Sequence, residues 1–151
     1  MPDIHELIDF IVEVYIIYKD RVLLIHHKKA NAWRPIGGHI ELDEDPEEAL
    51  FREAKEESGL EIEVFGNKPD MKVEGVKFLI SPIYLNIHKA GGKHRHIALI
   101  YFARSKSNKV RLAVREHNEI KWFTKKDLSS PKFDIRQDVK FYANQALKKL
   151  T

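Results

Sequence analysis

Short runs of apolar residues recur along the chain, and their spacing predicts several strands separated by turns. A hairpin turn at Lys19-Asp20-Arg21 divides the first two runs, and Gly91 and Gly92 lie in a later turn. Residues 28–34 are expected to form a loop that leads to Pro35 and two glycines. The expected strands are Ile11–Tyr18, Val22–His27, Glu61–Phe65, Val73–His88 with an interruption at Ser81-Pro82, His94–Phe102 and Glu119–Phe123.

Two segments are predicted to be helices. The first covers Pro46–Ser58, because Asp45 can act as the N-cap, Glu48 completes a capping box and Gly59 suits a left-handed C-terminal residue. The second covers Lys140–Leu150, where apolar residues follow a helical period. Strands, a helix, more strands and a terminal helix predict an α/β fold, an α/β/α sandwich on a mixed β-sheet.

Composition limits the kind of protein that this chain can be. Its 151 residues are expected to form a single domain, 1–151, and 43% hydrophobic with 32% charged residues is typical of a soluble globular protein. The absence of cysteine excludes disulfides, zinc-thiolate sites and thiol catalysis. We find no pattern of a signal peptide or membrane span, so we expect no membrane partner and a cytoplasmic location. A net charge of +3 is small for a dedicated nucleic-acid binder, although it does not exclude one.

The first helix carries the strongest indication of chemistry. Glu53, Glu56 and Glu57 are i, i+3 and i+4 neighbours, so their carboxylates emerge on one face. Like charges at this spacing repel one another unless a cation lies among them. Mg²⁺ prefers hard oxygen ligands and commonly joins protein carboxylates to substrate phosphates. The alternative is a solvated acidic face without a ligand, but such a face would not require the glycines and the arginine that accompany these glutamates.

The segment from Gly38 to Leu60 fits the pattern G-x5-E-x7-R-E-U-x-E-E-x-G-U, where U is aliphatic, at every defined position. These positions are Gly38, Glu44, Arg52, Glu53, Ala54, Glu56, Glu57, Gly59 and Leu60. The segment therefore resembles a complete Nudix box. The order of elements also resembles the Nudix fold over nearly the whole chain, with residues 95–99 and 119–123 similar to later strands of MutT-like members.

The resemblance implies a role for each matching residue. Glu53, Glu56 and Glu57 would hold the metal, Mg²⁺ or alternatively Mn²⁺. Arg52 would orient a catalytic glutamate through a salt bridge, and Glu44 would support the loop-helix geometry. Backbone from the glycine region, Gly37 and Gly38, would join the coordination sphere, since glycine permits close approach.

The reaction that the resemblance implies is hydrolysis of a diphosphate linkage by an activated water. A carboxylate must take the proton from that water. Glu53 or Glu57 is our first choice for this base, and Glu116 comes next, because some family members use a glutamate before the late strand. Glu119 lies in the same region, and ordinary loop charge is the alternative for both.

Further candidates lie near the glycines or on a later strand. Arg34 is expected to contact a phosphate, and His39 could donate to a phosphate oxygen. Trp33 could stack on a nucleobase, with core packing as the alternative. His94 and His96 share a strand face at i, i+2 spacing, but a third histidine or a cysteine is not nearby in sequence. We therefore expect ordinary strand histidines rather than a metal site.

The substrate class is inferred mainly from the absence of residues that mark particular substrates in the family. ADP-ribose hydrolases tend to carry a proline about sixteen residues after the box, and diadenosine polyphosphate hydrolases a tyrosine slightly later. This chain has Gly75-Val76 and Lys77-Phe78 there. We expect a nucleotide-type substrate, a nucleoside triphosphate first, giving a nucleoside monophosphate and pyrophosphate. The alternatives are an RNA 5′-end pyrophosphohydrolase and a non-catalytic module that binds a nucleotide or RNA. A homodimer is compatible with the family resemblance.

Overall fold

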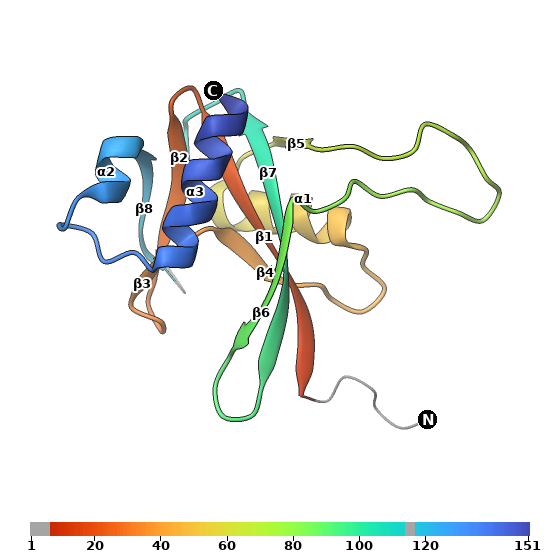
Figure 1. Cartoon of the computed structure of the whole chain (residues 1–151), viewed down its shortest axis with the longest axis horizontal. Helices are drawn as coiled ribbons and strands as arrows, with labels where there is room; N and C mark the ends of the chain where they lie inside the picture. Colours follow the sequence, from red (N-terminus) through yellow and green to blue (C-terminus); the bar gives the residue numbers. More distant parts are fainter. Residues whose placement is uncertain (1–6, 114–116) are drawn as a thin grey trace.

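A mixed β-sheet forms the centre of the structure, a computed structural model that describes residues 7–113 and 117–151 (Figure 1). Within these residues β1 and β7 pair in parallel, and the other paired strands are antiparallel. The predicted mixed sheet is therefore confirmed. The strands are β1 (Ile8–Tyr18), β2 (Arg21–His27), β3 (Ala32–Arg34), β4 (Ile36–His39), β5 (Ile62–Phe65), β6 (Tyr84–Lys89), β7 (Arg95–Ser105) and β8 (His117–Thr124).

Helices cover both faces of this sheet. α1 (Pro46–Ser58) buries Ala49, Leu50 and Ala54 against one face. α3 (Gln137–Leu150) lies across the other face, in front of β1 and β2 in Figure 1, and a short α2 (Lys125–Ser129) follows β8. This arrangement is the predicted α/β/α sandwich. Among the helices in the described residues, none has the length and apolar character needed to span a membrane.

β1 contributes side chains to both layers of the core, because successive side chains alternate between the two faces of the sheet. Ile11 and Tyr15 pack on the side of α3, whereas Val12 and Val14 pack on the side of α1. The same alternation places two acidic residues of β1, Asp9 and Glu13, on the α3 face. These two positions matter for the sites described below.

The boundaries of α1 agree with the sequence prediction. The Asp45 side chain accepts a hydrogen bond from the Glu48 backbone N–H at 2.9 Å, and the Glu48 side chain accepts one from the Asp45 backbone N–H at 3.1 Å. Gly59 ends the helix with φ of 75°, a left-handed conformation that glycine adopts without strain. The capping residues thus determine where the glutamates of α1 lie.

The predicted strand at Val73–His88 is wrong over most of its length. Residues 66–83 form a long loop between β5 and β6, at the right of Figure 1, and the strand begins only at Tyr84. Val73 and Val76 form a single bridge around Gly75, which has φ of 79°. Both valines are about half exposed. In the described part of the chain these β-branched residues therefore lack the longer neighbouring strand on which strand formation depends.

Three smaller elements also differ from the sequence prediction. The loop expected at residues 28–34 includes β3, which pairs with the end of β2. α2 was not predicted; Thr124 and Asp127 form a capping box at its start. α3 begins at Gln137, three positions before the expected Lys140. Short elements of this kind are stabilised by pairing and capping contacts, which hydrophobic periodicity does not register.

Candidate active site

Arg52 of α1 is the centre of a network of carboxylates. Its guanidinium holds Glu44 with two hydrogen bonds, from Nε at 2.7 Å and from Nη2 at 2.9 Å. Nη1 donates to Glu53 at 2.8 Å and to Glu56 at 3.2 Å, and Nη2 donates to the carbonyl of His39 at 3.0 Å. The hydrogen bonds from Arg52 lower the pKa of Glu44 to about 2. Arg52 therefore holds the loop before α1 and two glutamates in fixed relative positions.

Glu57 is held from two other directions. Its Oε1 accepts a hydrogen bond from the Gly37 backbone N–H at 2.9 Å, and its Oε2 lies 2.9 Å from His117 Nε2. His117 is almost completely buried, and its Nδ1 lies 3.3 Å from the carbonyl of Ala113. A carbonyl only accepts, so Nδ1 is the donor in that contact. His117 therefore orients Glu57 and is a residue that the sequence analysis missed.

The two glycines of β4 allow the backbone to approach α1 closely. A Cβ on Gly38 would lie 2.3 Å from Glu53 Oε1. A Cβ on Gly37 would lie 2.2 Å from the carbonyl oxygen of Val12 in β1. Any side chain at Gly38 would thus displace a carboxylate, and any side chain at Gly37 would disturb the pairing of β4 with β1.

These residues fit a divalent metal ion. Glu53, Glu56 and Glu57 supply hard carboxylate oxygens from one helix face, which is the donor type that Mg²⁺ prefers. Because Gly38 has no side chain, the Glu53 carboxylate can lie directly against the backbone of β4. Arg52 neutralises part of the acidic charge of Glu44, Glu53 and Glu56. The type of donor therefore suits a divalent ion such as Mg²⁺.

A cavity of about 400 Å³ extends from the box glutamates over the α3 face of the sheet. Burial raises the pKa of Glu13 to about 7, and the nearby Asp138 adds to this effect. Arg136 holds Asp138 through two hydrogen bonds, at 3.0 and 2.6 Å. The cavity is thus lined by both acidic and basic groups. Lining residues include Glu13, Arg34, Gly37, Gly38, His39, Glu53, Glu57, His88, His96, His117, Arg136 and Asp138.

Comparison with protein families decides the identity of this arrangement. The model of the NUDIX domain matches residues 11–145, nearly the whole chain. The chain belongs to the Nudix family. It is accordingly a Nudix hydrolase with a MutT-like fold, and the segment from Gly38 to Leu60 is its Nudix box. A search of curated proteins found no match.

Solved structures agree with the Nudix assignment. A hydrolase of the NUDIX family from Clostridium perfringens is 36% identical, with a TM-score of 0.83, over 95% of this chain and 98% of that chain. A MutT NUDIX hydrolase from Burkholderia pseudomallei is 23% identical, with a TM-score of 0.66, over 97% and 100%. An ADP-ribose pyrophosphatase from Streptococcus suis is 15% identical, with a TM-score of 0.61, over 93% and 90%. The last two likenesses concern the fold alone.

The residues predicted to bind substrate occupy different environments in this Nudix domain. Arg34 is exposed and lines the cavity, where it is free to meet an anionic group. Trp33 is only 7% exposed and packs edge-on against Phe123 and Phe133 in the core. This placement agrees with core packing, which the sequence offered beside stacking on a nucleobase. His39 lines the cavity, but its Nε2 lies 3.3 Å from Asp9.

The two glutamates near the late strand, Glu116 and Glu119, were also considered as catalytic bases. Glu116 lies outside the described residues, so its position relative to the box is not part of this structure. Glu119 lies on β8 and is exposed, opposite His26. Its placement is that of an ordinary surface charge. Among the described residues, Glu53 and Glu57 are the candidate bases that line the cavity.

Several cavity residues could not be found from a local motif. Glu13 could have been noticed, because it interrupts the apolar face that Ile11 and Tyr15 share in the predicted first strand. Arg136 and Asp138 come from the start of α3 and reach the cavity only through the packing of that helix. His94 and His96, expected to be ordinary strand histidines, lie beside His39 and an aspartate from β1.

Proposed function

We propose that this Nudix hydrolase cleaves the diphosphate linkage of a nucleoside diphosphate-X compound with Mg²⁺, or alternatively Mn²⁺, at the box glutamates. The substrate that we propose is a nucleoside triphosphate, with a nucleoside monophosphate and pyrophosphate as products. The observation that carries this proposal is that Glu53, Glu57 and Arg34 line one cavity, whose volume suits a small-molecule ligand.

The cavity offers contacts for both parts of a nucleotide. Arg34 supplies a guanidinium for phosphate oxygens. Glu13 and the partly exposed Arg136–Asp138 pair provide hydrogen-bonding groups for a nucleobase on the α3 face of the cavity. A carboxyl group with a pKa of about 7 is present in both protonation states near neutral pH, so Glu13 can either donate or accept a hydrogen bond. These groups support a base-recognition role for the α3 face of the cavity.

The residues of the box would position and activate water. Hydrolysis breaks one P–O bond of the anhydride, forms a P–O bond to the water oxygen, and transfers the water proton to a carboxylate base. Glu53 and Glu57 are the proposed bases; Arg52 orients the first, whereas Gly37 and His117 orient the second. A bound divalent ion would supply positive charge to the oxygens of the diphosphate. Fixed carboxylates avoid the loss of rate that follows from misplacement of the reacting groups.

A turnover screen with Mg²⁺ tests this proposal. The substrates are nucleoside triphosphates, nucleoside diphosphate sugars, ADP-ribose, dinucleoside polyphosphates and triphosphorylated RNA, and hydrolysis in ¹⁸O-labelled water identifies the phosphorus that is attacked. Selective release of a nucleoside monophosphate from a triphosphate supports the proposal. Turnover confined to triphosphorylated RNA would establish the RNA 5′-end alternative instead. Absence of turnover together with thermal stabilisation by a nucleotide would indicate a binding module.

The proposed substrate also suggests where the protein acts. Nucleoside triphosphates are cytoplasmic metabolites, and the chain contains no cysteine that would require an oxidising compartment. We therefore propose a cytoplasmic location. Imaging of the full chain with a fluorescent fusion in its source cell would check this directly.

A further inference from the structure

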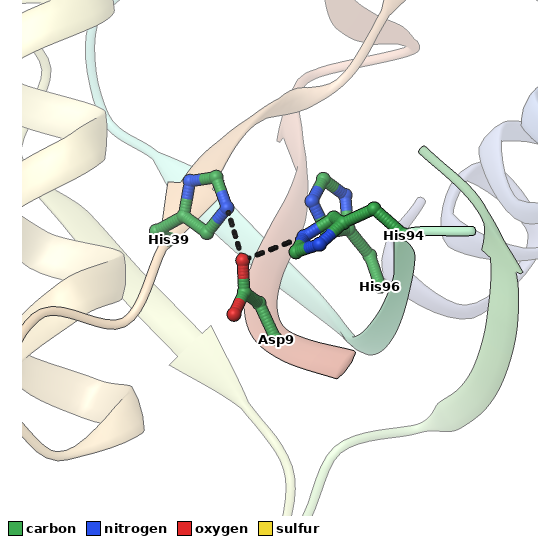
Figure 2. A group of neighbouring side chains, drawn as sticks. All are labelled: Asp9, His39, His94 and His96. Carbon is green, nitrogen blue, oxygen red and sulfur yellow. Dashed lines mark hydrogen bonds and ion pairs between the residues drawn. The ribbon is translucent and has the colours of Figure 1, made fainter. Parts of the chain in front are cut away.

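We propose that Asp9, His39, His94 and His96 form a second metal site, distinct from the glutamates of the Nudix box and suited to a transition-metal ion of the Zn²⁺ type (Figure 2). The four candidate ligand atoms all lie within 4.8 Å of one another. This inference is independent of the proposed substrate, because none of the four residues belongs to the carboxylate set of α1.

The register of the sheet brings these residues together. Asp9 on β1 pairs with His96 on β7, and His39 on β4 pairs with Ile11, two positions beyond Asp9. His94 stands two positions before His96, so alternation places both histidines on the face of the sheet that carries Asp9. Side chains from β1, from β4, from β7 and from His94 just before β7 therefore converge on one point, as Figure 2 shows.

The side chains already point toward a common centre. Asp9 Oδ2 lies 2.7 Å from His94 Nε2 and 3.3 Å from His39 Nε2. The ring of His96 is nearly perpendicular to those of His39 and His94, with centroid separations of 4.9 and 5.3 Å. The rings are therefore not stacked, and one nitrogen of each lies within 4.8 Å of the other ligand atoms. Small rotations of the side chains would thus place three nitrogens and one oxygen around an ion at the lengths of Zn–N and Zn–O bonds, about 2.0 to 2.2 Å.

The type of donor distinguishes this cluster from the box. Three imidazoles with one carboxylate match the ligands that Zn²⁺ commonly takes in tetrahedral sites, whereas Mg²⁺ selects oxygen donors. Simple ion pairing would be enough to explain the contacts of Asp9 with His39 and His94. It would give no role to His96, which adds a third nitrogen donor beside the pair. The complete set therefore fits a metal ion better than a simple ion pair.

The cluster is open to solvent and adjoins the substrate cavity. The side chains of His39, Asp9 and His94 are 57%, 36% and 32% exposed, so an ion can reach them without unfolding. His39 and His96 also line the cavity, and His39 directly follows Gly38 of the Nudix box. A metal ion bound here would join the end of β4 to β1 and β7, and would stabilise the backbone that carries the glycines of the box.

Zinc titration of the tag-free protein, treated with a chelator and dialysed, tests the proposal. Equilibrium binding is measured with Zn²⁺ in the presence of excess Mg²⁺, so that the box is saturated with the other ion. His94→Ala and Asp9→Asn each remove one ligand. His88→Ala is the matched control, because His88 lies 5.5 Å from His96 by ring centroid yet makes its own hydrogen bond to Asn86. Glu57→Gln reports on zinc that binds at the box.

The expected result is one Zn²⁺ per chain in the wild type, in His88→Ala and in Glu57→Gln with the same affinity. His94→Ala and Asp9→Asn should bind at least roughly tenfold more weakly, since even the loss of a residue that only supports a ligand costs 10- to 100-fold. Co²⁺ in the wild type should give the absorption bands of a tetrahedral site, and they should disappear in His94→Ala.

Thermal unfolding separates loss of the site from loss of the fold. Without zinc, His94→Ala and Asp9→Asn should unfold as cooperatively as the wild type, and zinc should raise the melting temperature only of proteins with all four ligands. The proposal is overturned if the wild type takes up no zinc in excess Mg²⁺. It is equally overturned if both folded ligand variants bind zinc as tightly as His88→Ala does.

Discussion

The glutamates of the Nudix box and the histidine cluster, formed by Asp9, His39, His94 and His96, are two groups of metal-ligand side chains that lie next to each other but arise in different ways. The box glutamates come from a single helix, and spacing along the sequence places them on one face. The cluster joins Asp9 to His94, 85 positions apart, through the register of three strands. A site whose residues lie within one helix can therefore be predicted from the sequence, whereas a site assembled by strand pairing can be identified only in the folded structure.

The largest effect that we expect is on the box. Glu57→Gln removes the negative charge but little volume, so turnover should fall by about a thousandfold while the fold is retained. The reason is that a metal ion stabilises the transition state by several kcal/mol, and each 1.4 kcal/mol corresponds to a factor of ten. Steady-state kinetics with Mg²⁺ and circular dichroism measure the two parts of the prediction.

The matched control for that variant is Glu61→Gln, an exposed glutamate shortly after α1, which should keep wild-type turnover. Zinc binding at the histidine cluster should be the same in both variants. Near wild-type activity in Glu57→Gln would remove Glu57 from the catalytic site and would leave the box without its best-oriented carboxylate.

Alanine substitutions at the two adjacent glycines of β4 should damage the protein in different ways, one by lowering activity and the other by lowering stability. Gly38→Ala places a Cβ against Glu53, whose flexible side chain must move away, so we expect turnover to fall by about a hundredfold with normal folding. Gly37→Ala places a Cβ against the backbone of β1, which cannot move as easily. That variant should lose roughly 1–3 kcal/mol of unfolding free energy.

Chemical denaturation and steady-state kinetics on both glycine variants separate these two effects. Each variant serves as the control for the other, because the substitutions are identical and adjacent. Equal loss of stability in both would mean that Gly38 is required for strand pairing rather than for the position of Glu53.

Arg52→Ala should have a smaller effect than removal of a metal ligand. Arg52 orients Glu53 and Glu56 and fixes Glu44, but its own atoms contribute no ligand, so we expect turnover to fall by about 10- to 100-fold. Arg52→Lys should recover only part of that loss, since an ammonium group cannot reproduce the two hydrogen bonds to Glu44. Kinetics of the two variants, with their melting temperatures, test this. Unfolding of Arg52→Ala at ordinary temperature would mean that the residue is mainly structural.

Arg52 also connects the box glutamates to the histidine cluster, because it donates a hydrogen bond to the carbonyl of His39. In Arg52→Ala the backbone at His39 loses that contact, so zinc affinity at the histidine cluster should weaken slightly while activity falls strongly. A larger loss of zinc affinity than of turnover would show that the two groups are coupled more closely than their separate ligand sets imply.

Much of the fold followed from the sequence, for physical reasons that can be named. The capping residues Asp45 and Gly59 correctly placed both ends of α1, because caps are local hydrogen-bonding devices. The strand predicted from Val73 forms only from Tyr84 onward, where it pairs with β7; among the described residues its earlier apolar positions have no such partner strand, and pairing is a property of the whole chain. The same reason explains why β3 and β4 were not predicted as strands.

The same distinction applies to the candidate site, where contacts within one helix could be predicted and contacts between distant elements could not. Arg52 makes the predicted salt bridge to a glutamate of the box, Glu53, within the same helix. His117, Arg136 and Asp138 could not be assigned to the cavity, because they come from β8 and α3, which reach it only through tertiary packing. Trp33 was placed beside the substrate by its proximity to the glycines in sequence. The alternation of β3 turns its side chain into the core instead.

The smallest effect that we expect concerns the start of α1. Asp45→Ala removes the N-cap, so the free energy of unfolding should fall by about 1 kcal/mol, which corresponds to a melting temperature lower by roughly 2–4 °C. Asp45 also forms an ion pair with Lys77 of the loop at residues 66–83, at 2.7 Å. Lys77→Ala is the matched control, and it should leave the melting temperature nearly unchanged because exposed ion pairs contribute little.

Asp45→Asn completes this set, because an asparagine caps a helix about as well as an aspartate does. Differential scanning calorimetry of the three variants should therefore order them with Asp45→Ala lowest and the other two close to the wild type. If Lys77→Ala falls as far as Asp45→Ala, the contact with the long loop stabilises α1 more than the cap does. The position of the box glutamates would then depend on a distant segment, as the histidine cluster does, and the contrast between a local and an assembled site would no longer hold.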